Sequence, residues 1–304
     1  MRRAWFLALL TALPAPALAW DGTGHMMVAA VAYDRLTPAA RSKADALLRR
    51  NPDYASWVAN VAPADRARAA FVHAATWPDD IKGRHGYIAA SEDPNAPAAM
   101  RITGYADRQE HREWHYVDIA FSPDGKRVNP PPKANAQAMI VAMRGVLATA
   151  DRTADARSYS LVWLLHLVGD IHQPLHAAER VTAEMPDGDR GGNSVHVCTT
   201  SCGHNLHAVW DDILGQNLSM DAVLAKAKAL PAAPAPAAAK TDPAAWAQES
   251  NALARSVVYA PPVQAEGQNF QLDMAYLQRA EAVAQSQVAL AGARLALLLN
   301  TALR

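Results

Sequence analysis

Residues 164–176 read LLHLVGDIHQPLH, an apolar run that carries three histidines and one aspartate. Its leucines and valine recur at the spacing of a helix, as do the apolar residues between His25 and Leu36. Alanine and leucine dominate the rest of the chain, again at helical rather than alternating spacing. We therefore predict an all-α fold of packed helices, with long loops and one short β-hairpin.

The same periodicity predicts helices at residues 38–50, 64–77, 134–150, 156–173, 204–214, 220–229, 243–256 and 270–302, the last being the longest. Loops are predicted at 84–98, 123–133, 181–194 and 230–238. The Ala/Pro tract 230–238 resembles a linker, but the helical material after it is too short and apolar to fold alone. We predict that residues 20–304 form one domain.

Residues 1–19 have the composition of a secretory signal. Two arginines precede an apolar stretch that runs to about Leu13, and Ala17-Leu18-Ala19 forms a small-residue cleavage site. The stretch is too short to span a membrane, and we find no other apolar run of the roughly 18 residues that spanning requires. We predict cleavage after Ala19, a mature chain that begins at Trp20, and a soluble protein in the periplasm or outside the cell.

Charge is balanced over the chain, with 29 basic and 29 acidic residues, and removal of the two N-terminal arginines leaves a slight acidic excess. A protein that holds nucleic acid by counterion release alone is usually basic. A nucleic-acid substrate would therefore require bound metal to supply much of the positive charge.

The chain contains two cysteines, Cys198 and Cys202. In an exported protein this spacing favours a small-loop disulfide. The alternative, a zinc-binding pair, lacks a second pair of cysteines.

Two His-x-x-x-Asp pairs carry the strongest chemical signal: His166 with Asp170, and His207 with Asp211. Residues four apart on a helix project from one face and can hold one ion. Pro174 then redirects the chain, which lets His176 turn toward a different ion. An exposed ion pair is the simpler interpretation of one such spacing, but both pairs lie in apolar helices, where an unpartnered carboxylate is costly. We interpret both as metal ligands.

Further candidates lie upstream, in Trp77-Pro78-Asp79-Asp80-Ile81-Lys82, in Glu113-Trp114-His115-Tyr116-Val117-Asp118, which has an extended pattern, and at His25. Taken singly each is weak, because a lone histidine beside aromatic residues is more often a packed side chain. His172 points away from the face of His166 and Asp170, and we predict a structural hydrogen-bonding role for it. Surface or packing roles are predicted for the remaining histidines, His73, His85, His111, His196 and His204.

Together these residues resemble the trinuclear-zinc, single-strand-specific nucleases and 3′-nucleotidases that fungi, plants and some bacteria secrete, which share a fold with bacterial zinc phospholipase C. The resemblance covers nearly the whole mature chain. It rests on motifs in the family's order: Trp20-Asp21-Gly22-Thr23-Gly24-His25, Ala75-Thr76-Trp77-Pro78-Asp79, Trp114-His115-Tyr116-Val117-Asp118, His166 to His176, Gly191-Gly192-Asn193, and Asn205-Leu206-His207-Ala208-Val209-Trp210-Asp211.

The resemblance implies a fold of the phospholipase C and zinc nuclease type and three bound Zn²⁺ ions. One ion would be held by Asp79, His115, His166 and Asp170. A second would be held by the α-amine and carbonyl of Trp20, by His25 and by the bridging Asp170. The third would be held by His176, His207 and Asp211.

The resemblance also implies hydrolysis of RNA and single-stranded DNA, with double-stranded DNA as a further possible substrate, to 5′-phosphorylated products, together with 3′-nucleotidase activity. Asp79 and Asp170 would serve catalysis, and Lys82 would place a cation beside the scissile phosphate. Tyr116 would stack on a base, Asp118 would accept its hydrogen bonds, and Asp212 occupies a position that can contact nucleotide. We expect a monomer that needs no protein partner or membrane.

Two alternative functions stay open, one with a different substrate and one without catalysis. A zinc phospholipase C would share fold and metals, but that group usually ends its ligand set with glutamate and has a longer gap after the N-terminal tryptophan. A non-catalytic zinc-binding protein would use His-rich flexible tracts, whereas these ligands are dispersed in apolar helices. An HD-type phosphohydrolase is disfavoured because no candidate ligand pair is an adjacent His-Asp doublet, and a zinc protease because HExxH is absent.

Overall fold

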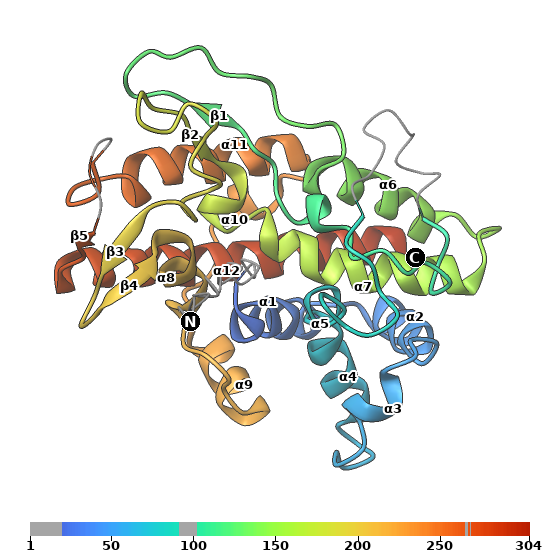
Figure 1. Cartoon of the computed structure of the whole chain (residues 1–304). Helices are drawn as coiled ribbons and strands as arrows, with labels where there is room; N and C mark the ends of the chain where they lie inside the picture. Colours follow the sequence, from blue (N-terminus) through green and yellow to red (C-terminus); the bar gives the residue numbers. More distant parts are fainter. Residues whose placement is uncertain (1–19, 91–101, 265–266, 268) are drawn as a thin grey trace, which may run out of the picture.

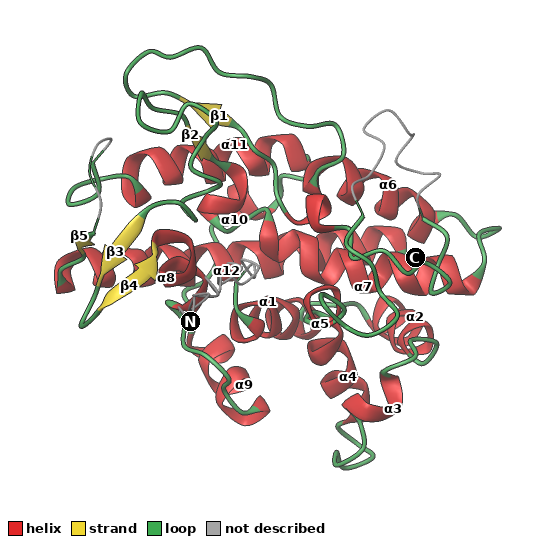
Figure 2. Cartoon of the chain, in the orientation of Figure 1, coloured by secondary structure: helices red, strands yellow, loops and turns green. Residues whose placement is uncertain are grey.

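The computed structural model describes residues 20–90, 102–264, 267 and 269–304. The predicted signal segment 1–19 and part of the predicted loop 84–98 lie outside these residues. Helices dominate the described chain, and the few strands are short (Figure 2). The all-α prediction is confirmed.

Helix α7 (Ala154–Asp170) lies at the centre of the molecule and packs against α1 (Gly22–Asp34), α2 (Pro38–Leu48), α6 (Ala136–Ala148) and α12 (Met274–Ala302). In Figure 1, α7 and α12 cross the middle of the view, with α1 to α5 and α9 below them and α6 and α11 above. From Ser158 to Asp170 every side chain of α7 is buried. His166 and Asp170 of this helix therefore lie inside the protein.

None of the other helices in the described chain is longer than α2. They are α3 (Tyr54–Trp57), α4 (Arg66–Ala74), α5 (Trp77–Asp80), the 3-10 turns η2 (Arg112–His115) and η3 (Pro174–Ala177), α8 (Leu206–Asp212), α9 (Met220–Ala229), α10 (Ala235–Ala238), α11 (Pro243–Leu253) and the π-helical turn η4 (Ala254–Val258).

Two small sheets lie at the edge of the helical body. Strands β1 (Ala120–Phe121) and β2 (Glu179–Arg180) pair in parallel. Strands β3 (His196–Cys198) and β4 (Cys202–Asn205) form the predicted hairpin, and β5 (Phe270–Gln271) pairs in parallel with β3. The Cys198–Cys202 disulfide closes the hairpin, as predicted.

Side-chain caps begin the helices that carry candidate ligands. Asp21 accepts hydrogen bonds from the backbone N–H groups of Thr23 (2.8 Å) and Gly24 (3.3 Å) at the start of α1. Asn205 accepts one from Ala208 (2.7 Å) at the start of α8. A capping side chain fixes the conformation of the first helical turn and, with it, the positions of the residues on that turn. His25 and His207 lie on these two turns.

Two predictions of secondary structure were wrong, and one predicted helix has shifted ends. The helix predicted at about 204–214 is α8, which begins at Leu206 because Cys202–Asn205 form β4. The segment predicted as extended from Glu113 forms η2 up to His115, because Trp114 is drawn into the core and stacks on His111 with ring centroids 3.5 Å apart. The predicted loop 230–238 contains the single turn α10.

By length and composition, helix α12 could cross a membrane, so the prediction of no second apolar run of this length was wrong. However, 67% of its most apolar window is buried inside the molecule, and the helix packs along α1. A core helix of a soluble protein has the same length and composition.

Candidate metal centre

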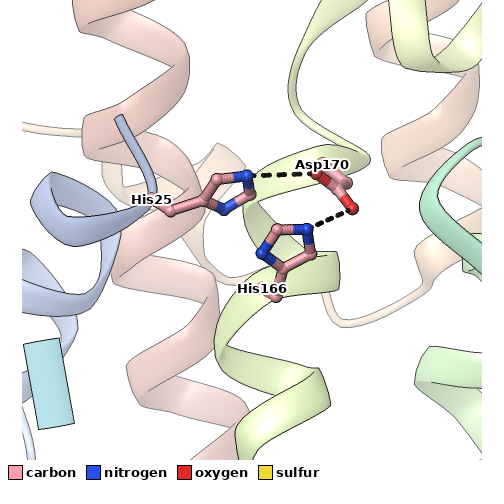
Figure 3. A group of neighbouring side chains, drawn as sticks. All are labelled: His25, His166 and Asp170. Carbon is pink, nitrogen blue, oxygen red and sulfur yellow. Dashed lines mark ion pairs between the residues drawn. The ribbon is translucent and has the colours of Figure 1, made fainter. Parts of the chain in front are cut away.

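Three side chains from α1 and α7 converge in the interior: His25, His166 and Asp170 (Figure 3). Asp170 Oδ1 lies 3.3 Å from His25 Nε2, and Asp170 Oδ2 lies 3.2 Å from His166 Nε2. The two imidazole rings stack with centroids 3.8 Å apart. One carboxylate is thus placed between two ring nitrogens.

Asp79 from α5 and His115 from η2 meet the same two residues of α7. His115 Nδ1 lies 2.9 Å from His166 Nε2 and 3.1 Å from Asp170 Oδ2. Asp79 Oδ1 lies 3.7 Å from both ring nitrogens. We call His25, Asp79, His115, His166 and Asp170 the Asp170 cluster.

A second cluster, the Asp211 cluster, consists of His176 from η3 with His207 and Asp211 from α8. His207 Nε2 lies 3.1 Å from His176 Nε2 and 3.3 Å from Asp211 Oδ2. The helix α7 ends at Asp170 and Pro174 opens η3, so the chain turns and carries His176 away from the α7 face.

Backbone carbonyls orient the histidines. Nδ1 of His176 donates to the carbonyl of His115 (2.7 Å), and Nδ1 of His207 donates to the carbonyl of Gly191 (2.6 Å). A carbonyl only accepts, so in each ring Nδ1 carries the proton. In the Asp170 cluster, His166 Nδ1 donates to the carbonyl of Ala75 (2.7 Å) in the same way. Such contacts leave Nε2 directed at the cluster, as in metal sites whose ligands are held by outer partners.

The donor atoms fit a cation. Burial lowers the pKa of His176, and burial together with His176 lowers the pKa of His207 to about 3, so both rings are neutral. Their Nε2 lone pairs therefore face each other across 3.1 Å, which is repulsive unless a positive ion lies between them. His25 Nε2 and Asp170 Oδ1 are likewise buried without a hydrogen bond in the described structure. Imidazole and carboxylate donors of this kind suit zinc.

The Asp170 cluster attracts positive charge. Burial raises the pKa of Asp170, but His166 and hydrogen bonds from the neighbouring rings outweigh it and hold the pKa well below its usual range. Burial likewise raises the pKa of Asp79, but the Lys82 ammonium and the histidines lower it further than burial raises it. Both carboxylates are therefore ionised.

Asp211 differs, because burial raises its pKa well above the usual range. Its one side-chain hydrogen bond comes from the neutral amide of Gln173 at 2.7 Å, and neighbouring carboxylates oppose ionisation. Among the described residues, Asp211 has no cationic side chain beside it that would compensate its charge.

Two glycines allow close approach at the clusters. A Cβ at Gly169 would lie 2.8 Å from His25 Nδ1, so α7 can receive the His25 ring only with glycine there. Gly191 has φ +60°, and a Cβ there would lie 2.7 Å from the carbonyl of Leu175. Both positions thus require glycine to bring ligand-bearing segments together.

Trp20 is fully buried beside both clusters. Its indole Nε1 donates to the carbonyl of Gly169 (3.1 Å), next to Asp170. The following N–H, of Asp21, donates to the carbonyl of Asp211 (3.1 Å). These two hydrogen bonds hold Trp20 between the segments that carry the two aspartates.

A cleft of about 260 Å³ opens over the clusters. His115, His176 and His207 lie at its wall, and Lys82 lies beside them with Nζ 2.6 Å from Asp79 Oδ1. Tyr116 and Asp118 also line the cleft. Burial, with Glu179 and Asp189 adding to it, raises the pKa of Asp118 to about 7.

Asp212 does not line the cleft. It is half-buried at the end of α8, and its charge acts on Asp211 and Asp21. The substrate contact predicted for Asp212 gains no support from this position.

The family profile described as S1/P1 Nuclease matches residues 20–304. The chain belongs to the S1/P1 nuclease family.

Three plant proteins are similar to this S1/P1 family member. They are Endonuclease 3 (25% identical over 220 residues), Endonuclease 4 (27% over 222) and Endonuclease 5 (23% over 224), all from Arabidopsis thaliana. Each alignment covers 70% of the chain. The aligned part spans only 60%, 61% and 62% of the respective plant proteins.

Gln173 and Arg294, for which the sequence predicted no role, form hydrogen bonds around the candidate metal centre. Gln173 donates to Asp211 and accepts from the N–H of Leu175, so it links η3 to α8. His172 donates through Nδ1 to the carbonyl of Val168 (2.7 Å) and accepts through Nε2 from Arg294 of α12 (2.8 Å), which is the structural role predicted for it. Gln173 could have been found from its place inside the HQPLH string, but Arg294 had no such signal.

Proposed function

We propose that residues 20–304 form a zinc-dependent endonuclease that hydrolyses RNA and single-stranded DNA to 5′-phosphorylated products and also removes 3′-phosphates from nucleotides. Membership of the S1/P1 nuclease family and similarity to three proteins named endonucleases support this proposal. We further propose that the mature enzyme begins at Trp20, is exported, and acts as a monomer.

The observation that carries the proposal is the pair of facing Nε2 lone pairs of His176 and His207 below a cleft that also contains Lys82. Two neutral imidazoles held in this way by backbone carbonyls are stable when a cation joins them. The Asp170 cluster, with its ionised carboxylates, supports two more cations at the same wall. Metal ions on one side of a cleft, with a lysine beside them, would attract the negatively charged oxygens of a phosphate ester.

We assign the ligands in three sets. One ion would be held by Asp79, His115, His166 and Asp170, and the next by His25, Asp170 and the amine and carbonyl of Trp20. The third would be held by His176, His207 and Asp211. Asp170 belongs to two sets, which agrees with its two oxygens facing different histidines.

Bound zinc would supply Lewis acidity and a water activated for attack near neutral pH. Side chains of the protein would supply the remaining functions, which are charge stabilisation and substrate binding. Asp79 and Asp170 hold the positive charge in place, and the Lys82 ammonium neutralises charge that develops on the phosphate. Tyr116 offers a ring on which an unpaired base can stack. Asp118 offers carboxylate oxygens to the edge of that base.

The test uses purified protein that begins at Trp20. It is incubated with RNA, single-stranded DNA, double-stranded DNA and 3′-nucleotides, before and after removal of metal by a chelator and again after zinc is restored. We expect cleavage of RNA and single-stranded DNA that the chelator abolishes and zinc restores. Activity that survives complete metal removal, or zinc-loaded protein inert on all four substrates, would refute the proposal.

A further inference from the structure

A buried carboxylate outside the metal clusters organises one edge of the cleft. Glu110 is 3% exposed. Its Oε1 accepts from the N–H of Gly83 (2.7 Å), the residue after Lys82. Its Oε2 accepts from Nε of Arg112 (2.6 Å). One side chain thus fixes both the turn that carries the cleft lysine and the arginine of η2.

Arg112 is held with its guanidinium free for a ligand. Glu110 engages only Nε, and in the described part of the chain neither Nη has a hydrogen-bond or ion-pair partner. The side chain is 46% exposed and lines the cleft together with Lys82 and His115. A guanidinium has five donors in a rigid plane, so the two remaining nitrogens present a fork suited to phosphate oxygens.

The backbone relates Arg112 to the metal centre. Arg112 and His115 are the first and last residues of η2, a 3-10 turn, in which side chains three apart lie on the same face. Their Cα atoms are separated by roughly 6 Å along the turn. Trp114, fully buried and stacked on His111, keeps the turn in place. Arg112 and His115 therefore both line the cleft, with their Cα atoms roughly 6 Å apart along the turn.

We propose that Arg112 binds a backbone phosphate next to the scissile one, and that Glu110 positions it for this contact. This inference rests on the proposed nuclease function and extends it: the cleft recognises an oligonucleotide through at least two successive phosphates. Lys82, paired with Asp79 beside the clusters, serves the scissile phosphate. Arg190 is the other arginine that lines the cleft, and it is exposed. Among the described residues no carboxylate holds its guanidinium, so its position is not fixed as that of Arg112 is.

The test compares two substrates, an oligothymidylate and thymidine 3′-monophosphate, which has a single phosphate. For Arg112→Gln we expect the loss of kcat/KM on the oligothymidylate to exceed the loss on the mononucleotide about tenfold, the size of one charge-assisted contact. Glu110→Gln keeps an acceptor for Gly83 but loses the charge that holds Arg112. Glu110→Gln should therefore also lose more kcat/KM on the oligothymidylate than on the mononucleotide, but by a smaller factor than Arg112→Gln.

The matched control is Arg108→Gln. Arg108 lies in the same segment, stacks on the ring of Tyr87 at 5.3 Å and does not line the cleft, so its loss changes net charge equally. It should lower activity on the two substrates by the same factor. Thermal unfolding of each variant separates loss of fold from loss of binding.

Binding provides a readout independent of turnover. The affinity for a fluorescent phosphorothioate oligothymidylate, which resists cleavage, is measured over a range of salt concentrations. Loss of one phosphate contact should reduce the slope of log affinity against log salt by roughly 0.7 for Arg112→Gln and leave it unchanged for Arg108→Gln.

Equal losses on both substrates, or an unchanged salt slope in a folded Arg112→Gln protein, would overturn the inference. Wild-type protein that cleaves neither substrate would instead count against the proposed function. The salt slopes would still decide the role of Arg112.

Discussion

The Asp170 cluster and the Asp211 cluster share residue types but differ in how their charge is balanced. The carboxylates of the Asp170 cluster face several histidines and Lys82, and their pKa values lie below the usual range. The pKa of Asp211 lies well above it, because burial is opposed mainly by the neutral amide of Gln173. Neighbouring protein groups thus stabilise the ionised carboxylates of the first cluster, whereas ionisation of Asp211 needs an added cation.

The largest effect should come from Asp170→Asn. Because Asp170 faces both His25 and His166, its charge serves two of the three proposed ions, and we expect two zincs to be lost. Losing an outer partner of a metal ligand can cost about 100-fold in activity. Asp170 is a proposed ligand itself, so activity should fall by more than this. Zinc per protein, measured by atomic spectroscopy, and the rate on single-stranded DNA check this outcome.

Asp211→Asn is the matched control, since it makes the same change in the other cluster. It should cost one zinc and leave two. Equal zinc losses in the two variants would remove the proposed distinction between the clusters.

An extension before Trp20 should have the next largest effect. If the α-amine of Trp20 binds an ion of the Asp170 cluster, a retained methionine or short tag should cost one zinc and most of the rate. The burial of Trp20 beside Gly169 supports this expectation. Zinc content and rate are compared with those of protein cleaved after Ala19, and an extended form with full zinc and full rate would contradict it.

Gln173→Leu should affect only the Asp211 cluster. The substitution removes the one side-chain hydrogen bond to Asp211 and should weaken zinc binding there by about 10- to 100-fold. The two other ions should bind as before. Competition with a fluorescent chelator resolves these affinities, and a uniform weakening at all three ions would show that Gln173 supports the fold rather than one cluster.

The smallest effect concerns Asp118, which belongs to neither cluster. Its pKa is raised to about 7 by burial and neighbouring carboxylates, against 3.8 for the unperturbed group. Between these values the unfolded chain releases a proton that the folded chain retains, so stability falls as pH rises through this window.

Asp118→Asn removes that dependence. The variant should gain melting temperature relative to wild type above pH 7 and show no such gain below the unperturbed pKa of 3.8. Melting curves over this pH range, recorded without metal, give the comparison. If melting temperature depended on pH in the same way in the two proteins, the titrating group would not be Asp118.

Local geometry was the part of the site that the sequence could predict. His166 with Asp170, and His207 with Asp211, share helix faces because their spacing is one turn, and no tertiary information was needed. The change of direction after Pro174 was equally local. The apolar periodicity likewise predicted most of the helices.

Contacts between distant segments could not be predicted. The carbonyls that orient the histidines come from Ala75, His115 and Gly191, and nothing in a backbone group marks it as an acceptor. The 3-10 turn at His115 depends on the burial of Trp114, which overrides the extended pattern of that segment. The role proposed for Glu110 depends on its contact with Gly83, which lies 27 residues away in the sequence.

His115 joins the two clusters through different parts of one residue. Its ring nitrogen faces Asp170, while its carbonyl holds the ring of His176 at 2.7 Å. An ion that immobilises the His115 ring therefore also steadies the backbone on which the Asp211 cluster depends. We expect metal loading to be cooperative: filling either cluster should raise the affinity of the other by the same factor, because coupling between binding sites is reciprocal.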